Sequence, residues 1–71
     1  MKGGVLTDDI YIEFVDFDTG DLIATRSVPP GCVPSQYHYI RLGELEALRR
    51  VEQVTWTIDA DEVPSVVIRL R

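Results

Sequence analysis

The sequence has a single cysteine, little positive charge and no long hydrophobic run, and each of these scarcities excludes a class of protein. Cys32, being alone, cannot form an internal disulfide, whereas small secreted domains usually carry several cysteines. Seven basic residues against twelve acidic ones give a net charge of −5, which disfavours binding to phosphate backbones. No apolar stretch approaches the roughly 20 residues that a membrane-spanning helix needs, and no signal peptide is evident. We therefore expect a cytoplasmic protein that contacts neither membranes nor nucleic acid directly.

Catalytic and ligand-binding motifs are also missing. No phosphate-binding loop, dinucleotide fingerprint or metalloprotease helix is present. Residues 18–20 spell the Asp-Thr-Gly signature of aspartic proteases, but the chain is too short to build a substrate cleft as well. A calcium loop that starts at Asp16 fails, because Asp21 and Ser27 stand where glycine and glutamate are required. A hairpin turn with Gly20 in the left-handed conformation explains the same residues.

Cys32 and His38 are the remaining candidates for chemistry. A catalytic thiol needs a base, a group that orients this base, and an oxyanion hole, and the sequence identifies only the first of these. Two ligands are also too few for a structural zinc site, which normally has four. We therefore expect no enzyme activity, no catalytic residues, no metal and no cofactor.

Two segments near the C-terminus alternate between apolar and polar residues, as a half-buried strand does. The first, over residues 54–59, places Val54, Trp56 and Ile58 on one face. The second, over residues 63–70, follows an acidic turn and shows the same alternation. Because Trp56 is the only tryptophan and has the largest apolar area to bury, we expect it to anchor the core.

An earlier pair of strands is expected over residues 10–17 and 22–28. The strand at 10–17 differs from the others because both of its faces carry apolar side chains. Such a strand is either covered on both sides or forms part of an interface. The face that remains after the core is formed consists of Tyr11, Val15 and Phe17.

The segment between the two strand pairs has three features. Residues 29–36 contain three prolines and indicate a rigid connector. Residues 37–40 fit an extended piece and the entry to a helix equally well. A hydrophobic stripe at a spacing of three then predicts a short helix over residues 43–51. This stripe consists of Leu42, Leu45, Leu48 and Val51.

These elements predict a two-layer α+β domain. The order is strand, strand, helix, strand, strand, and its simplest form is a four-stranded, mainly antiparallel sheet with the helix packed on one face. A chain of 71 residues makes one small domain, covering residues 1–71, in which residues 1–7 form a loose N-terminus.

Acidic residues are concentrated in two stretches. Six of the twelve carboxylates lie among residues 8–21, and three more lie among residues 59–62. If the two hairpins lie side by side, both turns present carboxylates at one rim of the sheet. Alternatively, these charges only keep the turns polar and protect edge strands from aggregation. The candidate partner-binding residues are Asp16, Asp18, Asp21, Asp59, Asp61, Glu62, Tyr11 and Phe17.

This pattern favours a non-catalytic protein-binding domain. We expect an inhibitor or regulator that occupies a basic surface of a partner protein, one that would otherwise bind nucleic acid. In size, acidity and order of elements the chain resembles small inhibitor and adaptor proteins, including phage-encoded inhibitors, although it shares no motif with them. The alternative is a structural or assembly subunit, with homodimers held together by the apolar face of Tyr11, Val15 and Phe17.

Overall fold

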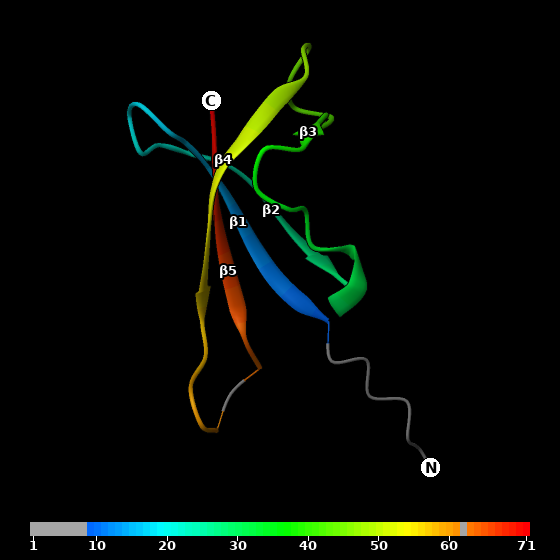
Figure 1. Cartoon of the computed structure of the whole chain (residues 1–71), viewed down its shortest axis with the longest axis vertical. Helices are drawn as coiled ribbons and strands as arrows, with labels where there is room; N and C mark the ends of the chain where they lie inside the picture. The colour runs from blue at the N-terminus through cyan, green and yellow to red at the C-terminus, as the bar shows by residue number, and fades with distance from the viewer. Residues whose placement is uncertain (1–8, 62) are drawn as a thin grey trace.

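The computed structural model describes residues 9–61 and 63–71, and this part of the chain forms one curled sheet (Figure 1). The expected loose N-terminus at residues 1–7 lies outside the described residues. The elements are β1 (Ile10–Asp16), β2 (Leu22–Val28), the 3-10 turn η1 (Pro30–Cys32), β3 (Tyr39–Ile40), β4 (Arg49–Thr57) and β5 (Ser65–Leu70).

The strand order contradicts the predicted four-stranded α+β fold. The sheet has five strands in the order β2-β1-β5-β4-β3, and its central strand, β5, runs parallel to β1. The other neighbours are antiparallel. The sheet curls into a half-barrel, so its own curvature, rather than a helix, encloses the core.

No helix forms over residues 43–51, and within the described residues the only helical element is the 3-10 turn. The hydrophobic stripe does not share one face: Val51 is fully buried in β4, whereas Leu48 is 56% exposed. A helix this short is marginal without strong packing, and Gly43 weakens its start. Instead β4 begins at Arg49, and at this start it pairs with β3 on one side and with β5 on the other, where Val51 is buried.

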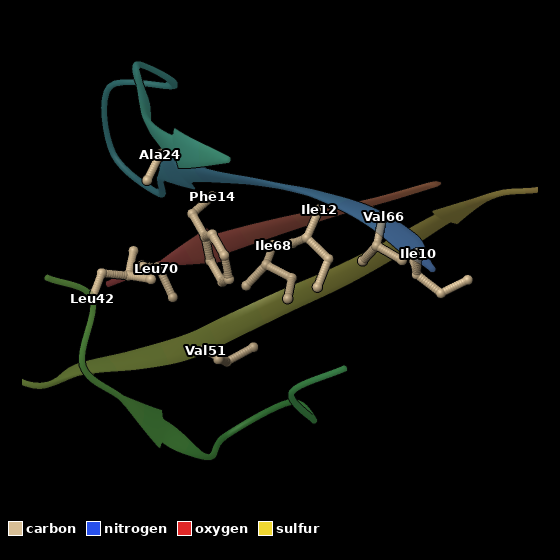
Figure 2. Packing of buried hydrophobic residues seen from close by; sticks show 9 residues of the cluster. All are labelled: Ile10, Ile12, Phe14, Ala24, Leu42, Val51, Val66, Ile68 and Leu70. Atoms are coloured by element: carbon tan, nitrogen blue, oxygen red, sulfur yellow. The ribbon is translucent and has the colours of Figure 1, made fainter. Parts of the chain in front are cut away.

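The core lies on the concave face of the sheet and is mainly aliphatic (Figure 2). The alternation predicted for β5 is confirmed, since its three inward side chains are almost completely buried. The expected inward face of β1 is also buried. The buried core consists of Ile10, Ile12, Phe14, Ala24, Leu42, Val51, Val66, Ile68 and Leu70.

Trp56 does not anchor this core. It lies opposite Val66 on the core side of the sheet, as its alternation predicts, but remains 44% exposed. Ile58, two residues further along, is 71% exposed. Burial on this face decreases along β4, from the fully buried Val51 to the exposed Trp56. The alternation therefore predicted the face of Trp56 correctly but overestimated its burial.

The first hairpin agrees with the sequence. β2 has the predicted bounds, and Gly20 adopts the left-handed conformation with φ 79°. A register shift between Phe14 and Val15 adds an irregularity within the strand pair itself. In the ambiguous segment at 37–40 only Tyr39 and Ile40 are extended, as β3, which pairs with Arg49 and Arg50. Tyr37 lies in a turn and has a left-handed φ of 70°.

The segment that leads into β4 closes one end of the half-barrel. Leu42 is buried there and Leu45 packs against the core from the same segment. The guanidinium of Arg26 in β2 donates a 2.6 Å hydrogen bond to Glu44 Oε1, which ties this segment to the far edge of the sheet. The hydrogen bond from Arg26 lowers the pKa of Glu44. At the opposite end of the half-barrel Ile10 and Val66 are buried, and the partly buried Val28 and Val33 pack against the core.

Candidate functional site

Asp16, the first acidic candidate, is engaged in the turn after β1. Its Oδ1 accepts the backbone N–H groups of Asp18 and Thr19 at 2.8 and 3.0 Å. Its own carbonyl accepts the N–H of Gly20 at 2.8 Å. These bonds form an Asx-type turn, in which a carboxylate replaces water for backbone groups that have no strand partner.

Arg49 holds the other oxygen of Asp16. One guanidinium nitrogen lies 3.0 Å from Asp16 Oδ2, and Nε donates to the carbonyl of Arg71 at 2.9 Å. The backbone bond from Thr19 and the hydrogen bond from Arg49 lower the pKa of Asp16. Asp16 thus joins the ends of β1, β4 and β5, and its replacement by lysine would disturb the fold as well as the surface charge.

The remaining candidates of this turn are Asp18, Asp21 and Phe17. Both carboxylates are exposed and neither takes part in an ion pair among the described residues. Phe17 is 36% exposed, with the guanidinium carbon of Arg71 lying 5.3 Å from its ring centre. A cation over the ring face is a favourable contact within the chain, and it leaves Phe17 less available to a partner.

The second acidic turn connects β4 to β5. Thr57 pairs with Ser65, so residues 58–64 form the connection beyond the last pair. Asp59 and Asp61 are exposed there, and among the described residues they make no ion pair. Glu62, the third acidic candidate of this turn, lies outside the described residues.

The two acidic turns lie at opposite ends of the sheet, so the expected single acidic rim does not form. Because β1 and β5 are parallel, the turn after β1 lies at the carboxyl end of both strands, while the connection before β5 lies at their amino end. Figure 1 shows the turn after β1 in cyan and the connection from β4 to β5 in orange at opposite ends. The prediction of one rim assumed that the two hairpins lie side by side with their turns at the same end, and this assumption was wrong.

Exposed apolar side chains accompany the second turn. Trp56, Ile58 and Val63 are 44%, 71% and 53% exposed, and all three lie at or beyond the last strand pairs. Tyr11, 45% exposed, lies at the same end because it pairs with Ser65. Its side chain, however, lies on the outer face of the sheet, whereas Trp56 lies on the core side. We define the hairpin-tip surface as Trp56, Ile58, Asp59, Asp61 and Val63.

The structure therefore brings together only part of the predicted site. Asp59 and Asp61 share the hairpin-tip surface, and Tyr11 lies at the same end but on the outer face of the sheet. The other candidates lie at the far end: Asp16, Asp18, Asp21 and Phe17. Sequence reasoning missed the three apolar members because it placed Trp56 and Ile58 on the buried face of one strand and Val63 at the start of the next. Their alternation matches that of buried strands, and the sequence carries no separate signal that these side chains stay exposed.

The apolar face proposed for homodimers is interrupted. On the outer face of the sheet Tyr11 and Val15 alternate along β1 with Glu13, and Val15 lies beside Arg69 of β5. Phe17 follows the end of β1 and contacts Arg71 instead. This outer face is mixed in polarity, unlike the hairpin-tip surface, where three apolar side chains lie close along the chain.

Cys32 and His38 share no hydrogen bond within the described residues. Cys32 ends the exposed 3-10 turn, and His38 is exposed and contributes backbone bonds, accepting the N–H of Val51 at 2.8 Å. A hollow of about 350 Å³ is lined by Glu44, Glu46, Ala47, Leu45 and Arg49. The charges of Glu44 and Arg49 are already paired with those of Arg26 and Asp16.

The described residues contain no cluster of three or more metal-ligating side chains and no helix long and apolar enough to cross a membrane. Comparison with protein-family models, curated proteins and solved structures finds no match for the chain. The geometry of the chain itself is therefore the basis for a functional proposal.

Proposed function

We propose that this protein is a non-catalytic, cytoplasmic protein-binding domain that uses the hairpin-tip surface to occupy a basic site on a partner protein. The observation that carries the proposal is the joint exposure of Trp56, Ile58 and Val63 beside the carboxylates of Asp59 and Asp61. Aromatic and aliphatic anchors with charges at their margin are typical of protein interfaces.

The charge of the chain supports a basic partner. The net charge of −5 attracts positively charged surfaces and repels phosphate backbones. A protein surface that binds nucleic acid is strongly basic, so occupation of such a surface would inhibit or regulate it without chemistry. Electrostatic attraction would speed association, and added salt would slow it.

The test compares two exposed apolar residues at different places. Ile58 belongs to the hairpin-tip surface, whereas Leu48 lies before β4 and is 56% exposed. Binding proteins are captured from lysates of the cells that express this protein, with the parent, Ile58→Ala and Leu48→Ala proteins as bait. Each captured protein is then purified, and its affinity for all three proteins is measured by titration. We expect Ile58→Ala to weaken binding about tenfold, as truncation of an interface anchor does, and Leu48→Ala to leave it unchanged.

Salt dependence is measured on the same pairs. The association rate should fall as ionic strength rises, because the Debye length shortens to about 10 Å at 0.1 M salt. A partner that binds the parent and Ile58→Ala proteins equally well, or whose association rate ignores salt, would contradict the proposed function.

A further inference from the structure

The strand β4 is paired on both sides over only part of its length. On one side it runs along β5 as far as Thr57, but on the other side β3 pairs only with Arg49 and Arg50. The side chain of Gln36 extends this cover slightly, donating from Nε2 to the carbonyl of Glu52 at 3.0 Å. Beyond Glu52, no described residue pairs with the outer edge of β4.

Backbone geometry identifies the groups that face outward. The carbonyl of Leu70 accepts a hydrogen bond at 2.8 Å from the residue after β1, so the backbone groups of Leu70 face β1. Since these groups alternate along a strand, those of Arg69 face β4 and meet Gln53. The backbone groups of Gln53, Thr55 and Thr57 therefore face β5. Those of Val54 and Trp56 point away from β5, toward the unpaired edge of β4.

This edge lacks the usual protection against strand pairing. Natural proteins guard exposed edges with charge, proline or covering segments. Residues 53–58 contain neither charge nor proline, and Val54, Thr55 and Trp56 favour strands. At the other edge of the sheet, by contrast, Arg26 in β2 donates to the carbonyl of Thr25 at 2.7 Å and binds Glu44.

The charge near this edge indicates which kind of strand could pair with it, a second copy of the chain or a segment of another protein. Asp59 and Asp61 follow it directly, and both are exposed. A second copy of the chain would bring its own net charge of −5 against these carboxylates, which disfavours pairing of β4 with itself. A basic segment would instead place its charges opposite them.

We propose that the outer edge of β4 at Val54 and Trp56 accepts an extended, basic segment of a partner protein as an added strand. This inference rests on the proposed function and specifies its mode of recognition. Backbone hydrogen bonds would supply affinity, and the exposed indole of Trp56 and the carboxylates of Asp59 and Asp61 would select an apolar segment with basic ends.

The test uses defined peptides and the full chain. The probe is a blocked peptide of alternating valine and threonine with lysine at each end, and its control has glutamate at each end. Binding is followed by fluorescence of Trp56, the only tryptophan, and by hydrogen exchange of single amides. We expect the lysine peptide to slow exchange at Val54 and Trp56 by at least about tenfold at saturation, with β2 amides unchanged. The glutamate peptide should bind about tenfold more weakly.

Three results would overturn strand addition: no protection of the two amides, equal protection along β2, or equal binding of both peptides. Protection that grows with protein concentration in the absence of peptide would also overturn it, since the occupant would then be a second copy. Val54→Pro removes one outward N–H and leaves the bonds to β5 in place. If Val54→Pro does not fold, hydrogen exchange of the parent protein with the lysine peptide still tests strand addition.

Failure of this mode can be separated from failure of the proposed function. If a captured partner loses affinity for Ile58→Ala but binds folded Val54→Pro normally, the hairpin-tip surface is the site and strand addition is wrong. If the lysine peptide slows exchange at Val54 and Trp56 but captured partners bind Ile58→Ala as tightly as the parent, strand addition is supported and the proposed function is wrong.

Discussion

Two isoleucines offer a matched test of how this chain separates stability from binding. Ile68 in β5 is fully buried, whereas Ile58 beyond β4 is 71% exposed. Replacing a buried isoleucine by alanine removes three carbons, worth about 2.4 kcal/mol at about 0.8 kcal/mol each. The cavity adds to this value, so we expect Ile68→Ala to cost about 2–5 kcal/mol. Since less than a third of Ile58 is buried, the same change there should cost under about 1 kcal/mol.

These values are large compared with the stability of such a domain, which is about 4–10 kcal/mol for a chain of this length. In urea, with a slope near 1 kcal/mol per molar, the unfolding midpoint of Ile68→Ala should fall by about 2 M or more. The midpoint of Ile58→Ala should stay within about 1 M of the parent.

Circular dichroism with urea titration measures both variants under identical conditions, and an unchanged slope confirms that the denatured states are comparable. Equal destabilisation by the two changes would refute the reasoning, because the connection from β4 to β5 would then be packed as tightly as the core. A stable Ile58→Ala protein that also binds its partner at full strength would show that Ile58 is not an anchor.

Three further predictions follow from the same structure. Leu48→Ala should change the free energy of unfolding by less than about 0.5 kcal/mol. If residues 43–51 formed the predicted helix, the change would instead be as large as at a buried leucine. The pKa of Asp16 is lowered by its bonds to Thr19 and Arg49, so its charge stabilises the fold above its ordinary pKa near 4. This contribution disappears as pH falls through the lowered value, and in acid titrations Asp16→Asn should flatten the loss of stability below about pH 4. Asp59→Lys should weaken partner binding in titrations, whereas Asp18→Lys at the far end should leave it unchanged.

Local patterns predicted β1, β2 and β5 well, but the strand expected over residues 54–59 is β4, which runs over Arg49–Thr57 and includes residues assigned to the helix. The turn at Gly20 placed β2 correctly, and period-2 alternation identified the buried faces of β1 and β5. The left-handed Gly20 followed from turn chemistry alone. Each of these features depends on residues close together in the sequence, where steric and hydrogen-bonding preferences act directly.

The errors arose where long-range pairing decides the structure. Leu42, Leu45, Leu48 and Val51 match a helical stripe, but the parallel pairing of β1 with β5 leaves β4 as the next strand and draws Val51 into it. No local signal announces a parallel pair, because its partners are separated by the whole middle of the chain. The single acidic rim failed for the same reason.

The two ends of the half-barrel differ in how their polar and apolar groups are satisfied. At the end with the first turn, Asp16 is bound by Arg49, and Leu42 closes the core. At the other end, Trp56 and Ile58 are exposed and one edge of β4 is unpaired among the described residues. Groups that already have partners within the chain stabilise the fold and offer little to another protein. The exposed groups at the other end contribute little to folding and include apolar, charged and backbone groups together, so substitutions of these residues should change binding far more than stability.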